Sequence, residues 1–240
     1  MDKTLDVVSN FCAVIVIIGK NANNGGIPMN VFDVTKEKWG FLRETKELAQ
    51  KAGIDADTGL HRTGLEEYLA VIFPDVTDWV HDKTVDTLPK DLKCRKRPDY
   101  RSEMLKMIVE FDGTPHYTDP KVIRADMEGV ELYERFGYKV VRIPFFIQLS
   151  NSAVKELFGV DVSEPLFNEN IPSIGLGGAN PANICWAGLC RMAKEFRRFP
   201  EQYKTNLEFL KSFNDEYITG ANLLDTLYNA SDGSTISMPI

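Results

Sequence analysis

Three carboxylates near the middle of the chain have a spacing that could bring them together. Asp99 follows a proline and begins a short extended segment, and Glu110 and Asp112 lie at the end of residues 105–112, LKMIVEFD. β-Branched and aromatic residues are dense in that segment, which predicts a strand with Glu110 and Asp112 on one face. A polar turn at residues 101–103 would make a hairpin and place Asp99 beside the pair.

A group of carboxylates at one point favours the binding of a divalent cation, because like charges repel one another. Oxygen ligands suit Mg²⁺, with Mn²⁺ as the alternative. Such a metal lowers the pKa of a bound water and stabilises negative charge on a transferring phosphoryl group. The alternative is that each carboxylate belongs only to the solvated face of a strand.

A basic run precedes Asp99, although the chain as a whole carries a formal net charge of −7. Local positive charge beside an acidic cluster suits a polyanionic substrate, since phosphate contacts dominate affinity for nucleic acids. A solvated surface loop is the alternative interpretation. The residues expected to contact a DNA backbone here are Lys93, Arg95, Lys96 and Arg97.

The order of residues across 63–147 resembles the PD-(D/E)XK nuclease superfamily. It is most similar to the very-short-patch-repair-like branch, which includes repair nickases, restriction enzymes and phage homing endonucleases. The residues that carry the resemblance are Asp99, Glu110, Asp112, Gly113, His116, Tyr117, Arg124, Asp126, Gly137, Tyr138, Arg142 and Pro144.

This resemblance implies an α/β (α+β) fold, a restriction-endonuclease-like mixed sheet flanked by helices. It also implies a Mg²⁺-dependent endonuclease that hydrolyses phosphodiester bonds of double-stranded DNA. We expect site-specific cleavage of the restriction or homing type, with mismatch nicking in repair as an alternative. A two-fold symmetric target would imply a homodimer.

The resemblance also implies roles for individual residues. Asp99, Glu110 and Asp112 would bind the metal, and a helix before the core would add Glu66, although Glu66 also suits a capping box with Thr63. Arg124 and Arg142 would join the basic run in holding phosphates. The expected catalytic residues are Asp99, Glu110, Asp112, His116 and Asp126.

One position departs from the superfamily pattern. Asp112 stands where many members carry lysine, so it cannot act as a cationic activator. His116 is the best replacement, because an imidazole titrates near neutral pH, and Lys139 is the second choice. The departure leaves open a nuclease-fold DNA-binding module that does not cleave. A nuclease that acts on RNA is a third interpretation, although the sequence shows no aromatic and basic motif for recognition of single strands.

Length and composition fit a globular chain of 240 residues, with 43% hydrophobic and 26% charged residues. We expect an N-terminal accessory segment at 1–60, a nuclease core at 61–150 and a mainly helical C-terminal extension at 151–240. Apolar periodicity and caps predict the elements. Helices are expected at 63–73, 120–136, 184–196 and 203–213, and strands at 79–85 and 138–143.

Basic residues on and just after the expected helix at 184–196, including Arg191, are interpreted as a solvated face, with phosphate contact as the alternative. The four cysteines form no CxxC pair, which favours reduced thiols in the cytoplasm. The apolar run at residues 13–18 is too short to span a membrane, so no membrane partner is expected. A structural zinc would have only a partial ligand set, from Cys94, His61 and His81.

Overall fold

A computed structural model describes residues 65–85, 97–163, 172–174 and 180–230 of the chain. The chain divides into two compact units, Met1–Glu67 and Tyr68–Ile240. The predicted accessory segment at 1–60 lies outside the described residues. Helix α3, Leu65–Ile72, confirms the predicted helix at 63–73 in the part that is described. Thr63 of the expected capping box lies outside the described residues.

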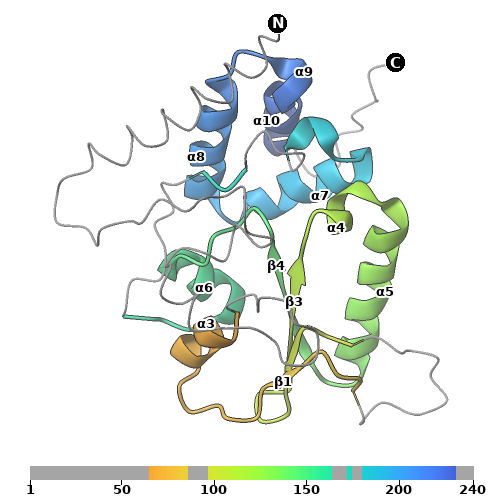
Figure 1. The fold of residues 1–240 in the computed structure, drawn as a ribbon, viewed down its shortest axis with the longest axis vertical. Helices are drawn as coiled ribbons and strands as arrows, with labels where there is room; N and C mark the ends of the chain where they lie inside the picture. Colours follow the sequence, from red (N-terminus) through yellow and green to blue (C-terminus); the bar gives the residue numbers. More distant parts are fainter. Residues whose placement is uncertain (1–64, 86–96, 164–171, 175–179, 231–240) are drawn as a thin grey trace, which may run out of the picture. The chain divides into compact units, whose positions relative to one another are not determined.

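The described part of the second unit contains a four-stranded mixed sheet with the order β1-β2-β3-β4 (Figure 1). Its first three strands pair antiparallel, and β3 pairs parallel with β4. This confirms the predicted mixed α/β architecture with helices flanking the sheet. The strands are β1 Val80–His81, β2 Tyr100–Ser102, β3 Met107–Asp112 and β4 Lys139–Pro144.

The connection between the parallel strands is helix α5, Pro120–Arg135. Its bounds agree with the predicted helix at 120–136, and for the predicted reasons. The Asp119 side chain accepts a hydrogen bond from the Lys121 amide at 2.8 Å, and Pro120 occupies the first turn. Gly137 follows the helix with a φ of +82°, a conformation that glycine adopts without steric cost.

The predicted turn at residues 101–103 is wrong in its position. Arg101 and Ser102 belong to β2, and the turn occupies residues 103–106. Asp78 explains the difference, because its carboxylate accepts hydrogen bonds from Ser102 Oγ at 2.6 Å and from the Glu103 amide at 2.8 Å. Tertiary partners therefore allow polar residues to stay buried in a strand.

The helices around and beyond the sheet complete the described unit. In Figure 1, α5 and α6 lie on opposite sides of β3 and β4. The predicted helices at 184–196 and 203–213 are confirmed as α7 and α8 with slightly different bounds. The remaining helices are α4 Pro115–Thr118, α6 Asn151–Phe158, α7 Trp186–Phe196, α8 Pro200–Lys211, α9 Glu216–Thr219 and α10 Ala221–Asn229, with a short 3₁₀ turn, η2, at Pro181–Asn183.

An aromatic cluster joins the end of the sheet to the C-terminal helices. Tyr117 of α4 contacts Phe145 and Phe146, which follow β4, with ring centroids 5.4 and 5.2 Å apart. Phe146 packs on Phe196 of α7 at 4.6 Å, and Phe196 on Tyr203 of α8 at 5.8 Å. These contacts pack α7 directly against the segment that follows the sheet. Buried aromatic rings contribute strongly to the stability of a core, so this contact helps to hold α7 in place.

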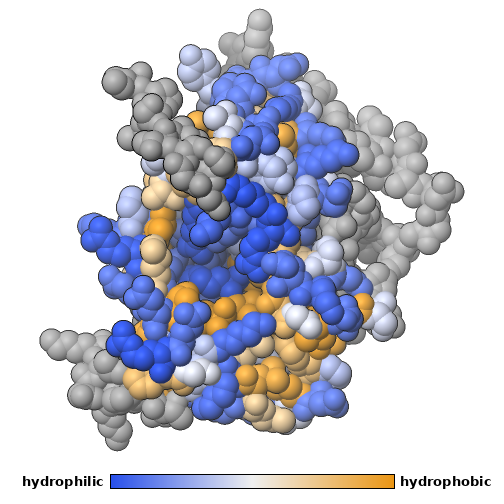
Figure 2. All heavy atoms as spheres, turned by 180° about the vertical axis from the view of Figure 1, so that it is seen from behind, coloured by the Kyte–Doolittle hydropathy of each residue, from blue (hydrophilic) through white to orange (hydrophobic). Residues whose placement is uncertain are grey.

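Hydrophilic residues cover much of the described surface seen in Figure 2, and hydrophobic residues gather in the lower part of that view. Among the helices that the structure describes, none has the length and apolar character that a membrane crossing requires.

Candidate functional site

Asp99 and Glu110 lie side by side, as the predicted hairpin requires. Tyr100 pairs with Val109 in the antiparallel register, so Asp99 comes opposite Glu110. The Asp99 amide points at Glu110 Oε2 at 3.4 Å, and the Asp99 carboxylate accepts a hydrogen bond from the Phe111 amide at 2.6 Å. Two carboxyl groups are therefore fixed by backbone pairing at one place on the sheet.

These two carboxyl groups are costly to ionise together. Burial and the neighbouring charge of Asp99 raise the pKa of Glu110 to about 7. Burial also raises the pKa of Asp99, and the charge of Asp112 adds to the effect. A divalent cation between oxygen donors would relieve both penalties, so the donor set fits Mg²⁺.

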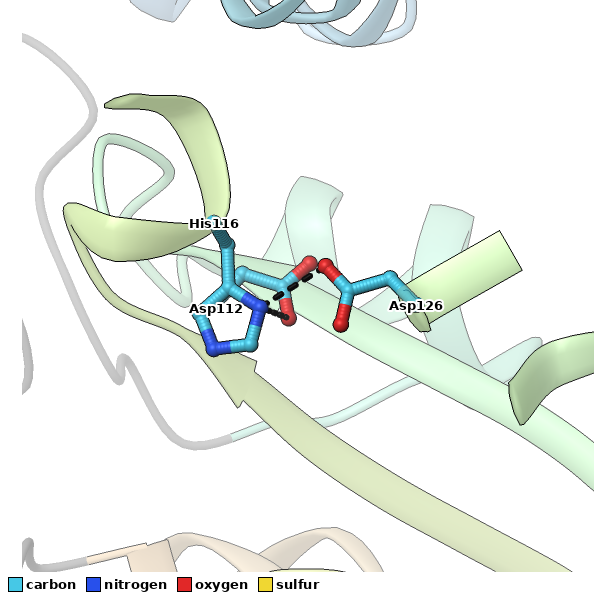
Figure 3. A group of neighbouring side chains, drawn as sticks. All are labelled: Asp112, His116 and Asp126. Atoms are coloured by element: carbon cyan, nitrogen blue, oxygen red, sulfur yellow. Dashed lines mark hydrogen bonds and ion pairs between the residues drawn. The ribbon is translucent and has the colours of Figure 1, made fainter. Parts of the chain in front are cut away.

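A second group lies beyond Glu110, where β3 ends and α4 and α5 approach it (Figure 3). Asp112 is fully buried at the end of β3, His116 belongs to α4 and Asp126 to α5. His116 Nδ1 lies 2.7 Å from Asp126 Oδ2 and 3.6 Å from Asp112 Oδ1. One potential ligand atom from each residue lies within 4.8 Å of the others, so this group could also hold a metal.

Two arginines already neutralise the carboxylates of this second group. Arg142 of β4 donates to Asp112 through Nε at 2.9 Å and through Nη2, and its Nη2 lies 3.0 Å from Asp126 Oδ1. Arg191 of α7 donates through Nη2 to Asp112 and through Nη1 to Asp126 Oδ2 at 3.0 Å. Both oxygens of Asp112 are therefore paired with guanidinium groups.

The charge balance differs between the two groups. No ion pair joins Asp99 or Glu110 to a cation among the residues that the structure describes, although Arg142 lowers the pKa of Glu110 through its charge. By contrast, Asp112 and Asp126 have two guanidinium partners. Asp99 and Glu110 are thus the more suitable ligands for a cation, and Asp112 contributes charge beside them.

His116 is held in one orientation by Asp126. Burial lowers the pKa of His116, but the hydrogen bond to Asp126 and the charges of Asp112 and Asp126 outweigh burial and raise it overall. Nε2 points away from both carboxylates in Figure 3 and has no hydrogen-bond partner among the described residues. An imidazole oriented through one nitrogen leaves the other available for proton transfer.

The structure places the other predicted residues less centrally. Lys139 donates to the Phe158 carbonyl at 3.1 Å, so the second-choice cationic activator has a structural partner elsewhere. Arg97 is exposed and pairs with Asp82 at 3.4 Å, and Arg124 is exposed on α5. Arg142 contacts Asp112 and Asp126, so its phosphate-binding role stays a prediction.

Several predicted residues cannot be related to the site. Glu66 is half-buried on α3 in the first unit, and its metal role stays a prediction. Of the zinc set, His81 contacts Tyr100, with the ring centroids 4.9 Å apart and the ring planes tilted by 35°. The predicted residues that lie outside the described ranges are Lys93, Arg95, Lys96, Cys94 and His61.

Sequence reasoning missed Arg191, because it assigned the basic residues of this helix to a solvated face. The Arg191 side chain is only 18% exposed and reaches the site from the predicted C-terminal extension. The local signal was the spacing of Arg191 and Glu195, which form an i,i+4 pair at 2.9 Å. That spacing is common on helix surfaces, so it did not indicate a buried guanidinium.

Comparisons of the chain with protein-family models, with curated proteins and with solved structures found no match.

Proposed function

We propose that this protein is a Mg²⁺-dependent endonuclease that hydrolyses phosphodiester bonds in double-stranded DNA. The observation that supports this most directly is the juxtaposition of Asp99, directly before β2, and Glu110 of β3, next to Asp112 and an oriented His116. The same residue order, found independently in the sequence, resembles the very-short-patch-repair-like nucleases.

In this proposal, Asp99 and Glu110 hold the metal. Bound there, Mg²⁺ would supply Lewis acidity and lower the pKa of a coordinated water. The chain itself supplies the rigid strands that fix both carboxyl groups, because Asp99 accepts from the Phe111 amide and its own amide faces Glu110. Half-buried carboxylates kept in this geometry would lose little entropy when the cation binds.

His116 then acts as the proton-transfer or phosphate-stabilising residue. Asp126 receives the Nδ1 hydrogen and leaves Nε2 oriented toward the reacting groups in the proposal. Because the pKa of His116 is raised, more of the imidazolium form is present at neutral pH. The imidazolium suits both the role of an acid and a contact with phosphate. Asp112, which stands in place of lysine, accepts hydrogen bonds from Arg142 and so holds that guanidinium beside the site.

From the resemblance, we further propose site-specific cleavage of the restriction or homing type by a cytoplasmic enzyme. A two-fold symmetric target would require a homodimer. Exposed Arg97 and Arg124 and the basic run before them are the proposed phosphate contacts.

The test is cleavage of supercoiled plasmid and phage DNA in Mg²⁺, Mn²⁺ or EDTA. Wild type is compared with Glu110→Gln, which keeps side-chain size, and with Glu131→Gln, a matched change on the exposed face of α5. We expect metal-dependent cutting in wild type and Glu131→Gln that is lost in Glu110→Gln. Cutting that persists in Glu110→Gln would contradict the assigned site.

A second candidate is a nuclease-fold DNA-binding module that does not cleave. The observation that favours it is the pairing of both Asp112 oxygens with arginines, which gives this carboxylate a stable role without metal. DNA binding by a folded wild-type protein, without cutting of any of several DNAs in Mg²⁺ or Mn²⁺, would favour this module over the nuclease. Competition between DNA and RNA would test the remaining RNA-nuclease reading.

A further inference from the structure

We infer that Arg191 is a positioning residue of the site, and that helix α7 is therefore part of the functional machinery. This inference rests on the proposed nuclease function. It goes beyond that function because α7 lies outside residues 63–147, the range that carries the resemblance, so the resemblance assigns no role to Arg191.

The contacts of Arg191 span the whole second group. Its guanidinium donates to both Asp112 and Asp126, and Nη1 also donates to the His116 carbonyl at 3.2 Å. One rigid, planar fork thus fixes the strand end, helix α4 and helix α5 relative to one another. Arginine suits this task, because its donors have a fixed geometry that matches carboxylates.

Residues behind Arg191 hold it in place. Nε donates to Glu195 Oε1 at 2.9 Å, and Glu195 Oε2 accepts from the Tyr117 hydroxyl at 2.5 Å. The guanidinium carbon lies 4.8 Å from the centroid of the Tyr117 ring, a cation–π distance. Glu195 and Tyr117 therefore restrict Arg191 to the orientation in which it reaches Asp112.

The backbone of α7 approaches α4 so closely that the contact is specific. A Cβ atom at Gly188 would lie 1.8 Å from the Tyr117 carbonyl oxygen, so only glycine fits there without a shift of the backbone. Cys185 Sγ donates to the same carbonyl at 3.1 Å. This backbone contact does not depend on the ion pairs. It places Arg191 beside Tyr117, the residue that follows His116.

The function of Arg191 follows from these contacts. Asp112 and Asp126 would repel one another if their charge were unmatched, and Asp126 would then lose the position from which it accepts the His116 Nδ1 hydrogen. Arg191 and Arg142 share this charge and reach His116 differently. Arg142 Nη2 lies 3.4 Å from the imidazole Nδ1, whereas Arg191 donates to the His116 carbonyl. Removal of Arg191 should therefore disturb the orientation of His116 while leaving Asp99 and Glu110 in place.

The experiment measures kcat and KM for DNA cleavage, at saturating Mg²⁺, in the full chain. Arg191→Ala is compared with Arg191→Lys and with a matched control, Arg198→Ala, whose exposed guanidinium pairs with Glu156 at 2.9 Å on the surface. Thermal melting of each variant is measured first. If Arg191→Ala does not fold, Arg191→Lys tests the inference, because lysine keeps the positive charge but lacks the planar set of guanidinium donors.

We expect Arg191→Ala to lower kcat by about 100-fold with little change in KM, since misplacement of about 1 Å costs that much. Millimolar guanidinium should restore part of the activity of Arg191→Ala. The same addition should not change the activity of Arg198→Ala. Arg191→Lys should also lose kcat while remaining folded. A positioning role predicts rescue, which a purely structural role does not.

Two results would overturn the inference. One is an unchanged kcat in folded Arg191→Lys or Arg191→Ala, with an active wild type, and this leaves the proposed function intact. The other is a loss that follows the unfolded fraction and is not rescued by guanidinium. Failure of the wild type to cut any DNA would instead remove the proposed function, and this inference with it.

Discussion

His116 Nδ1 lies 2.7 Å from Asp126 Oδ2, although the two residues belong to different helices, α4 and α5. The connection between the helices is only Asp119, whose side chain caps α5. The turn therefore sets the angle at which the second helix leaves, and that angle brings Asp126 back to the imidazole.

Asp126→Asn should lower the pKa of His116. The hydrogen bond to Asp126 and its charge both raise that pKa in the wild type, and they outweigh burial. The mutation removes the charge and leaves the burial, so the imidazole should lose its proton at lower pH. An NMR pH titration of the His116 ring nitrogens in Mg²⁺-free buffer would measure the change.

The control for that titration is Asp161→Asn, because Asp161 is 83% exposed and pairs with Lys155 on the surface. It should leave the His116 titration unchanged. A pKa of His116 that is equal in Asp126→Asn and wild type would show that the dyad does not persist in solution.

His116→Gln should lower kcat by roughly 10²- to 10⁴-fold, the usual contribution of general acid–base catalysis. DNA affinity should change little, because the imidazole is one contact among many phosphate contacts. Single-turnover cleavage and DNA binding, measured on the same preparation, would separate the two effects. Equal loss of binding and cleavage would argue that His116 acts on affinity instead.

Glu110 should make the protein less stable as pH rises in the absence of metal. Its pKa is about 7 in the folded chain against an ordinary value of 4.5, so the folded state binds the proton more tightly than the unfolded state. Its contribution is therefore greatest below about pH 4.5 and is lost as pH rises through about 7. The size should be on the order of 1–3 kcal/mol.

Glu110→Gln should remove this part of the pH dependence, and Glu131→Gln, exposed on α5, should retain it. Denaturant unfolding in EDTA between pH 5 and 8 would measure both. Addition of Mg²⁺ at pH 8 should stabilise the wild type and not Glu110→Gln. The same slope in all three proteins would contradict a raised pKa of half-buried Glu110.

Gly188→Ala should destabilise the protein by about 1–3 kcal/mol, the usual cost of overpacking, because its Cβ would overlap the Tyr117 carbonyl. It should also reduce cleavage, since α7 must move and carries Arg191 with it. Chemical denaturation and cleavage rate would be measured together. Cys190→Ala, exposed on the same helix, is the matched control and should change neither quantity.

Arg124→Ala should weaken DNA binding about equally for all sequences and reduce the slope of log affinity against log salt by about 1. Arg124 is exposed on α5 and borders a surface hollow with Lys121, so a phosphate could reach it. Affinity measured over a range of salt concentrations tests this. A matched change is Arg135→Ala, exposed at the far end of α5, which should leave the slope unchanged.

Local sequence patterns predicted the main elements of the core and one half of the site, but not helices α4, α6, α9 and α10. Alternation in residues 105–112 predicted a strand with Glu110 and Asp112 on one face, and the strand that forms, β3, begins two residues later at Met107. Asp119, Pro120 and Gly137 predicted the bounds of α5. These signals are local, since side-chain period and helix caps depend on neighbouring residues. The hairpin that pairs Asp99 with Glu110 is also a short-range feature.

The countercharges of the site depend on tertiary packing. Arg191 is 79 residues away from Asp112, and its burial depends on how α7 packs against α4 through Gly188. Likewise, Asp78 determines that Arg101 and Ser102 extend β2, although their sequence suggests a turn. Ion pairs and hydrogen bonds between distant segments leave no periodic pattern in the chain, so the partner of a buried charge becomes known only when the elements are packed.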